Sequence, residues 1–110
     1  MAAAIEAKHA TPILVTPSAL QQWVGGKETN TRLGPYAAAM RDLGTTKMIE
    51  VDDLNARSVA LLNMIGQTAA MQIYIDGDKA HFTKYGATTM AQIVAQELRR
   101  IASPLAAYLK

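Results

Sequence analysis

The sequence predicts an α/β fold with parallel strands, and two observations support this prediction. Helical and strand patterns alternate along the 110 residues in the order helix, strand, helix, strand, helix, loop, helix. Such alternation is typical of parallel sheets covered by helices. The first strand candidate is apolar on both faces, as strands buried between helix layers are. The length fits one domain, so residues 1–110 are treated as a single domain or a fragment of one.

The first elements are a short helix and a strand. Residues 1–8 are rich in Ala, Glu and Lys, which favour helix, but no N-cap residue precedes them. We therefore expect the end of a helix that starts elsewhere. Residues 12–17 are an apolar run between two prolines and form the first predicted strand. Residues 18–32 mix Gln, Gly-Gly, Asn and Thr around a lone Trp23, which predicts a loop or a short helical turn.

The next two elements are a short helix and the second strand. Pro35 stands where the first helical residue is expected, and residues 36–43 are predicted to be helix. Gly44 is expected to end this helix, because glycine is the usual residue just beyond a helix C-terminus. Residues 47–51, Lys-Met-Ile-Glu-Val, are the second strand candidate.

A third helix follows this strand directly. Asp52 and Asp53 are candidates for its N-cap, and Gly66 is expected to end it. Its apolar residues are Leu54, Val59, Leu61, Leu62 and Ile65. Residues 67–78 are expected to be irregular, with a short extended piece at 71–75.

The last helix has the clearest pattern in the chain. Its apolar residues recur at helical spacing and predict one stripe that faces the core, formed by Met90, Val94, Leu98 and Ile101. Ser103-Pro104 is expected to end the helix. Two strands make a small sheet with both edges open, so the architecture is expected to be part of something larger.

Composition and charge exclude several classes of protein. The chain has no cysteine, which excludes disulfides, thiolate nucleophiles and Cys-ligated zinc. Its net charge is only +2 and its largest basic cluster is Arg99-Arg100, so no nucleic-acid partner is expected. No apolar run reaches the length of a membrane span, and the acid at Glu6 is unlike a secretion signal. No membrane partner is expected, and no cellular compartment is predicted from the sequence.

One loop combines titratable residues just before a helix. Asp78 stands three residues before His81, where its carboxylate can accept a hydrogen bond from one imidazole nitrogen and fix the tautomer. The other nitrogen is then free to act as a general base toward a hydroxyl nucleophile. The same residues also fit a plain loop in which both side chains are solvated and Thr83 caps the helix. The residue types alone leave these two interpretations equal.

The block Asp78-Lys-Ala-His81-Phe-Thr-Lys-Tyr-Gly-Ala87 resembles the last sequence block of the SGNH (GDSL-like) hydrolases. In that block the Asp and His of a Ser-His-Asp triad share one loop before the C-terminal helix. The rhamnogalacturonan acetylesterases are the branch that deacetylates plant cell-wall polysaccharides, and further segments of the chain resemble them: 7–17, 36–43, 53–61 and 106–110. The resemblance implies the C-terminal part of a flavodoxin-like parallel three-layer sandwich, with about two strands and three to four helices.

The same resemblance assigns roles to two residues of this chain. Asp78 corresponds to the orienting acid of the triad, and His81 corresponds to the base. The family's nucleophile lies in a Gly-Asp-Ser motif, and its oxyanion hole uses a Gly and an Asn from later strands. The sequence contains neither Gly-Asp-Ser nor Gly-x-Asn-Asp, so it is left open whether this chain alone is an enzyme. It also departs from the family at Asp52, where an apolar strand residue is expected, and at Ala80, where Thr is common.

None of the chain's serines is predicted to be the nucleophile. Ser18 follows the first strand but lacks a glycine-flanked turn, so it is expected to cap a helix or turn. Ser58 lies within a predicted helix, and Ser103 precedes a proline.

Neither a metal nor a cofactor is expected. Asp76-Gly-Asp78 resembles part of a calcium loop but lacks its remaining oxygen ligands. His9 is expected at a helix C-terminus rather than in a metal site with His81. Trp23 could stack on a sugar ring, but a lone aromatic residue in a loop is expected to pack against the nearby helix instead.

Two functions are consistent with the sequence. The first is the C-terminal segment of a carbohydrate acetylesterase, with an acetylated polysaccharide or small ester as substrate and the missing N-terminal half as partner. The alternative is a catalytically inactive interaction module derived from the esterase fold. A split enzyme, in which a separate chain supplies the first half, is a further arrangement. Because two strands leave edges open, a homo-oligomer that completes the sandwich is expected.

Overall fold

The structure, a computed structural model, describes residues 2–8, 10–101 and 103–109. Its elements in chain order are α1 (Ala2–Ala7), β1 (Ile13–Val15), β2 (Trp23–Val24), β3 (Lys27–Glu28), α2 (Gly34–Lys47), β4 (Glu50–Asp52), α3 (Leu54–Ala70), α4 (Lys84–Arg100) and the 3₁₀-helix η1 (Pro104–Tyr108). The predicted order of helices and strands is confirmed, and the hairpin β2–β3 and the helix η1 are additions to it.

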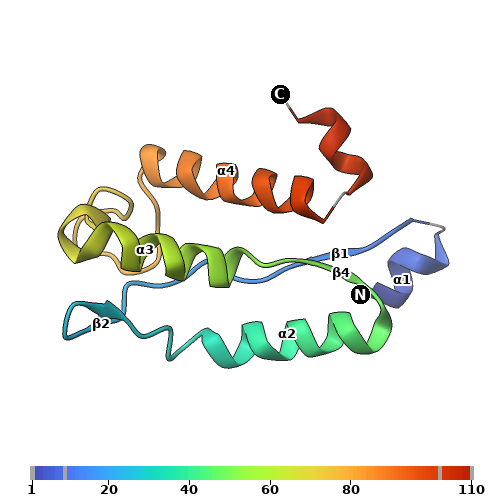
Figure 1. The fold of residues 1–110 in the computed structure, drawn as a ribbon, viewed down its shortest axis with the longest axis horizontal. Helices are drawn as coiled ribbons and strands as arrows, with labels where there is room; N and C mark the ends of the chain where they lie inside the picture. Colours follow the sequence, from blue (N-terminus) through green and yellow to red (C-terminus); the bar gives the residue numbers. More distant parts are fainter. Residues whose placement is uncertain (1, 9, 102, 110) are drawn as a thin grey trace.

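Strands β1 and β4 pair in parallel and form the centre of the fold. Ile13 lies opposite Glu50, and Val15 lies opposite Asp52. In Figure 1, α2 runs along one side of this pair and α4 along the other. The α/β class with parallel strands is therefore confirmed, and the arrangement is that of part of a flavodoxin-like sandwich.

Strand β1 is less covered than its sequence predicts. Ile13 and Leu14 are half-buried, and Val15 is 44% exposed. Among the described residues, β1 pairs with β4 alone, so its other edge has no strand beside it. The expectation of a strand buried on both faces is thus wrong here, because one neighbouring strand and its helices do not enclose it.

Helix α2 is longer than predicted, and the second strand starts later. The helix continues through Gly44 to Lys47 and ends where Met48 adopts a left-handed backbone with φ of 57°. Gly44 is buried against β4: an added Cβ would lie 2.4 Å from Val51 Cγ2. Gly44 therefore lies inside α2, where it allows the helix to pack closely against β4, and it does not end the helix. The strand predicted at residues 47–51 accordingly lies at Glu50–Asp52.

Helix α3 is capped by Asp53, whose carboxylate accepts a hydrogen bond from Ala56 N at 3.2 Å. Of the two cap candidates, Asp52 does not cap. Gly66 breaks the helical geometry, with φ of 86° and ψ of 166°, but the chain resumes a helical turn that reaches Ala70. The predicted stop is therefore a kink. The extended piece predicted at 71–75 is reduced to a single bridge at Tyr74.

Helix α4 is confirmed, but its buried face is rotated from the predicted stripe. Its buried residues are Gly86, Met90, Ile93 and Glu97, whereas Val94, Leu98 and Ile101 are half-buried. The rotation follows from Gly86, where an added Cβ would lie 2.0 Å from the Ile73 carbonyl oxygen. Helix α4 therefore packs closely against the backbone at Ile73, and the face that contains Gly86 is the one that makes this contact.

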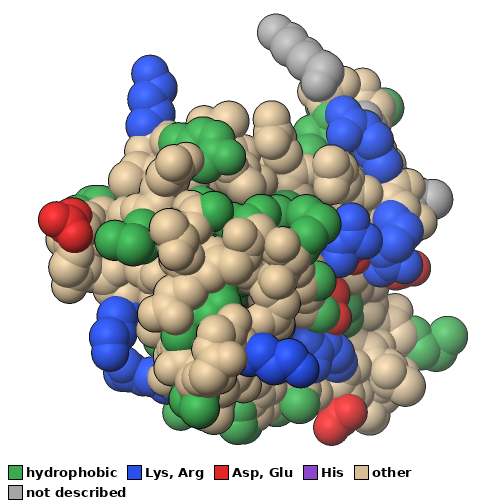
Figure 2. All heavy atoms as spheres, turned by 60° about the vertical axis from the view of Figure 1, so that its left-hand side comes forward, with side chains coloured by type: hydrophobic (Ala, Val, Ile, Leu, Met, Phe, Trp, Pro, Cys, Tyr) green, Lys and Arg blue, Asp and Glu red, His purple; other side chains and the backbone are tan. Residues whose placement is uncertain are grey.

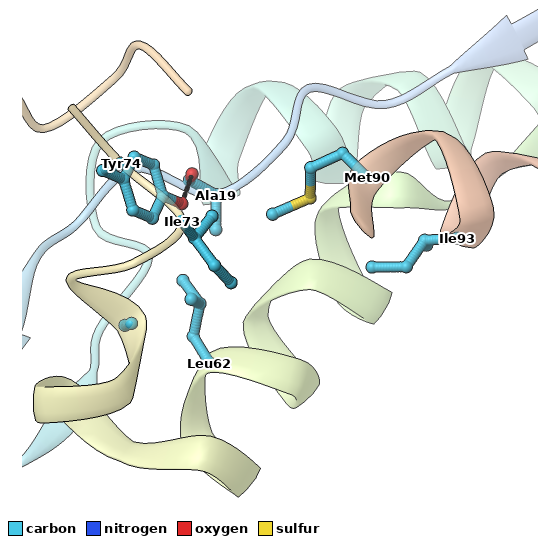
Figure 3. Close-up of a cluster of buried hydrophobic side chains, with 7 residues drawn as sticks. Ala19, Leu62, Ile73, Tyr74, Met90 and Ile93 are labelled. Carbon is cyan, nitrogen blue, oxygen red and sulfur yellow. Dashed lines mark hydrogen bonds between the residues drawn. The ribbon is translucent and has the colours of Figure 1, made fainter. Parts of the chain in front are cut away.

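The main hydrophobic core joins α3, α4 and the two segments that precede the hairpin and the last helix. Figure 3 shows Leu62 of α3 and Met90 of α4 pointing toward Ile73 and Ala19. Tyr74 is buried and donates its hydroxyl hydrogen to the Ala19 carbonyl at 2.6 Å. Burial raises the pKa of this phenol above its usual value, so it stays a donor.

Candidate active site

The loop that leads into α4 is fixed at its base. Thr83 caps α4, because its Oγ1 accepts a hydrogen bond from Gly86 N at 3.0 Å, and it also donates to the Gln72 carbonyl at 2.7 Å. Tyr74 and Phe82 form an antiparallel bridge with ring centroids 5.3 Å apart. The chain therefore reverses direction between Tyr74 and Phe82. Residues 75–81 form a loop whose two ends are held together by these contacts.

Asp78 and His81 contact each other within this loop. Asp78 Oδ2 lies 2.8 Å from His81 Nδ1. Asp78 Oδ1 accepts hydrogen bonds from Ala80 N at 2.7 Å and His81 N at 2.8 Å. The backbone closes around the pair, since Ile75 N donates to the His81 carbonyl at 2.9 Å. The contact that the sequence spacing predicts is present.

The electrostatics of the pair keep Asp78 ionised. Hydrogen bonds from the backbone N–H groups of His81 and Ala80, and then from the His81 ring, lower the pKa of Asp78 to about 2. An ionised Asp78 favours the imidazole tautomer with its proton on Nδ1, which leaves a lone pair on Nε2. The His81 side chain is 77% exposed, and Nε2 has no hydrogen-bond partner in the described part of the chain.

Both interpretations of this loop made from the sequence find support in its geometry. Thr83 caps the helix and His81 is exposed, as a plain loop requires. The Asp78–His81 contact is the one a general base requires. The loop therefore combines a helix cap at Thr83 with an Asp78–His81 contact.

A hairpin that was not predicted from the sequence lies beside this loop. Residues 18–32 were expected to be a loop or helical turn, but Trp23–Val24 and Lys27–Glu28 pair as β2 and β3. Gly25 and Gly26 form the two-residue turn, with φ of 59° and 79°. Two consecutive positive φ angles suit a type I′ hairpin turn. The Gly-Gly dipeptide between two short runs of mixed polar and apolar residues is the sequence feature from which this hairpin could have been predicted.

The hairpin and the Asp–His loop border one cavity. Its volume is about 530 Å³, and its lining includes Trp23, Gln67, Tyr74 and Asp78. Gln21 joins the two borders, because its N donates to the Lys79 carbonyl at 3.0 Å. The candidate acid Asp78 thus lies on the rim of a cavity that the sequence did not reveal.

The three serines lie as follows. Ser58 is buried in α3, where its hydroxyl accepts from Ala19 N at 2.9 Å and donates to the Asn55 carbonyl at 3.0 Å. Ser103 accepts from Leu105 N at 3.2 Å. Ser18 is half-buried in the segment after β1. In the described part of the chain, no hydrogen bond joins any serine to His81.

The rest of the structure bears on metal binding, membrane spans and surface charge. His9, which was considered as a metal ligand together with His81, lies outside the described residues. Across residues 2–8, 10–101 and 103–109, no group of three or more His, Cys, Asp or Glu could hold a metal ion. None of the helices in these ranges has the length and apolar character to cross a bilayer. On the face that Figure 2 shows, Lys and Arg side chains are spread out, and some lie beside acidic ones.

A parallel α/β fold with an Asp–His loop before its last helix is the arrangement expected for the C-terminal part of an SGNH-type hydrolase. Comparison with known proteins confirms the resemblance to the rhamnogalacturonan acetylesterase-like branch, and the match covers the C-terminal part of the relatives. No family model matches the chain.

The particular relatives are bacterial esterases. The chain is 30% identical over 102 residues to the probable rhamnogalacturonan acetylesterase YesY of Bacillus subtilis, a match that covers 89% of this chain and 46% of YesY. It is 30% identical over 97 residues to the uncharacterized esterase YxiM of the same organism, covering 87% of this chain and 25% of YxiM. The crystal structure of YxiM superposes with a TM-score of 0.84 and 29% identity, over 94% of this chain and 29% of that one. The chain thus spans less than half the length of these relatives.

Proposed function

We propose that this chain supplies the base and the orienting acid of a carbohydrate acetylesterase. The Asp78–His81 contact of 2.8 Å, in a chain similar to part of the probable acetylesterase YesY and of the uncharacterized esterase YxiM, is the observation that carries the proposal. In this proposal the nucleophilic serine and the oxyanion hole come from outside these 110 residues. In the described part of the chain Ser58 and Ser103 are hydrogen-bonded to other groups, and no hydrogen bond joins a serine to His81.

The mechanism uses His81 as a proton carrier. Nε2 takes the proton of the serine hydroxyl as the serine oxygen attacks the acetyl carbonyl carbon, and returns it to the sugar oxygen that leaves. The same nitrogen then takes a proton from water as the water oxygen attacks the acetyl carbon of the acetyl-enzyme. It gives this proton to the serine oxygen as the bond from that oxygen to the acetyl carbon breaks, which releases acetic acid and restores the serine. Asp78, ionised because its pKa is lowered to about 2, accepts the Nδ1–H bond throughout and stabilises the imidazolium.

The decisive experiment joins this chain to the remaining part of a relative. A chimera in which these residues replace the matching C-terminal part of YesY is assayed on an acetylated sugar. We expect hydrolysis, and we expect His81→Ala to lower kcat by about a thousandfold, with a comparable loss for Asp78→Asn. His9→Ala, at the chain's other histidine, is the matched control.

Circular dichroism establishes that the compared chimeras are equally folded. If the His81→Ala chimera hydrolyses the ester as fast as its parent, His81 is not the base and the proposal is wrong. The purified chain by itself is expected to be inactive on the same ester, since it lacks the nucleophile.

One observation favours the alternative function, a non-enzymatic module that associates with itself. In the described part of the chain β1 has an unpaired edge, and Val15 at its end is 44% exposed. Unpaired strand edges promote association with further strands. In this alternative a second copy of the chain covers β1, and His81 has no catalytic role.

A further inference from the structure

Gln21 ties the tip of the Asp–His loop to the rest of the molecule. Within residues 72–83 the loop is held by its own hydrogen bonds, such as the one from Asp78 N to the Ile75 carbonyl at 2.8 Å. In the described part of the chain, the hydrogen bonds that reach residues 76–81 from outside this range both come from Gln21. Its N donates to the Lys79 carbonyl at 3.0 Å, and its Nε2 donates to the Asp78 carbonyl at 3.3 Å.

The segment that carries Gln21 is itself firmly held. Two residues earlier, the Ala19 carbonyl accepts the hydroxyl hydrogen of the buried Tyr74 at 2.6 Å, as Figure 3 shows. One residue later, Gln22 N donates to the carboxylate of the buried Glu28 at 2.9 Å. Gln21 therefore lies between two fixed points, and from there it can hold a loop whose residues are mostly exposed.

The side-chain amide of Gln21 is matched to both of its partners. Its Oε1 accepts from the Trp23 indole Nε1 at 3.4 Å, and its Nε2 donates to the Asp78 carbonyl. An indole N–H can only donate and a backbone carbonyl can only accept, so the group between them must carry an acceptor and a donor together. A glutamine amide meets this requirement, whereas a carboxylate lacks the donor.

We propose that Gln21 is a positioning residue for the Asp78–His81 pair: it holds the backbone of Asp78 and Lys79, and thereby keeps His81 Nε2 where a serine hydroxyl from outside these residues can reach it. The proposal rests on the proposed function and adds to it a residue that acts through the loop. The Asp78–His81 contact is made within the loop, so it survives the loss of Gln21. What is lost is the location of the base, and a displacement of about 1 Å is enough to slow a reaction strongly.

The kinetic test uses Gln21→Met in the chimera with YesY, because methionine has a similar length and lacks the donor. We expect kcat to fall about fivefold, the effect of one hydrogen bond, with KM close to that of the parent chimera. A residue that only contacts the substrate would raise KM instead. Gln96→Met, at an exposed glutamine of α4, is the matched control and is expected to leave kcat unchanged.

A second background separates positioning from a general loss of folding. In a chimera that already carries His81→Ala, Gln21→Met is expected to cause no further loss of activity, because Gln21 acts through His81. A variant that merely folded less well would lose activity in both backgrounds.

Amide hydrogen exchange in the purified chain tests the same contact without catalysis. The N–H of residue 21 donates to the Lys79 carbonyl, whereas those of Ala80 and His81 donate to Asp78 Oδ1. In Gln21→Met we expect protection at residue 21 to fall about fivefold. Protection at Ala80 and His81 is expected to stay as in the parent chain, because those bonds lie within the loop.

Three results overturn the proposal: a parent-like kcat in a folded Gln21→Met chimera, an equal loss in the His81→Ala background, and unchanged protection at residue 21. A failure of the proposed function looks different. In that case the parent chimera is inactive, or His81→Ala hydrolyses the ester as fast as its parent, while the exchange measurement still decides whether Gln21 holds the loop.

Discussion

Asp52 and Asp53 are adjacent in sequence, but their carboxylates lie in opposite electrostatic surroundings. Burial raises the pKa of Asp53, but hydrogen bonds outweigh it, chiefly from Arg41 Nε at 2.7 Å, and the pKa is lowered overall. Asp52 is buried, and neither of its carboxylate oxygens has a hydrogen-bond partner in the described part of the chain. This burial, followed by the charge of Glu97, raises the pKa of Asp52 to about 6.

Replacing Asp52 is expected to change how stability depends on pH. Between its ordinary value of 3.8 and about 6, the folded chain keeps a proton on Asp52 that the unfolded chain has released. The contribution of Asp52 to the free energy of unfolding therefore falls as pH rises through this window. Asp52→Asn removes that contribution, so we expect a gain of about 3 kcal/mol at pH 7 that disappears toward pH 4.

Urea unfolding at several pH values between 4 and 7 measures this effect. The control is Asp42→Asn, at an exposed aspartate of α2, which is expected to leave the pH dependence unchanged. Equal curves for Asp52→Asn and the parent chain would show that Asp52 is hydrated or paired in solution.

At the scale of elements, Gly86 sets the position of α4. An added Cβ would meet the Ile73 carbonyl oxygen at 2.0 Å, and backbone atoms cannot move aside as a side-chain end can. Gly86→Ala is therefore expected to lower the free energy of unfolding by on the order of 3 kcal/mol, despite the better helix propensity of alanine. Thermal unfolding measures the loss, with Thr88→Ala at an exposed position of the same helix as control. A stability equal to that of the parent chain would contradict the close approach.

Elements governed by local sequence could be predicted, and those governed by distant contacts could not. The helix α4 and the Asp53 cap follow from nearby residues, and both are confirmed. Gly44 was expected to end a helix because its neighbours alone do not reveal Val51, which packs against it from β4. The rotation of the α4 face has the same origin, because it depends on the backbone at Ile73.

The candidate site divides in the same way. The Asp78–His81 contact spans three residues, so their spacing was sufficient to predict it. The cavity beside it needs Trp23 of the hairpin and Gln67 beyond the α3 kink to come together. No sequence pattern predicts that Trp23 and Gln67 lie close together, and the hairpin was not predicted either.

At the scale of the whole molecule, one edge of β1 has no partner strand among the described residues, and this edge predicts self-association. Val15→Lys places a charge on this exposed strand, and charged residues oppose edge-to-edge pairing. We expect the parent chain to sediment as a dimer or larger oligomer, and Val15→Lys to shift it toward monomer. Val24→Lys, at an exposed position in the paired hairpin, is the control. A parent chain that sediments as a folded monomer at every concentration contradicts this prediction.

The hydrogen bond from Tyr74 to the Ala19 carbonyl has a consequence for the order of folding. It joins residues 55 positions apart, and the N–H of the same Ala19 is bound by Ser58, 39 positions away. Closing such long chain segments costs entropy that local turns do not. The Asp–His turn can form early by itself, but its place beside the cavity is set only once the segment after β1 has docked onto α3. A chain whose β1 is detached would therefore retain the Asp78–His81 contact and lose its surroundings.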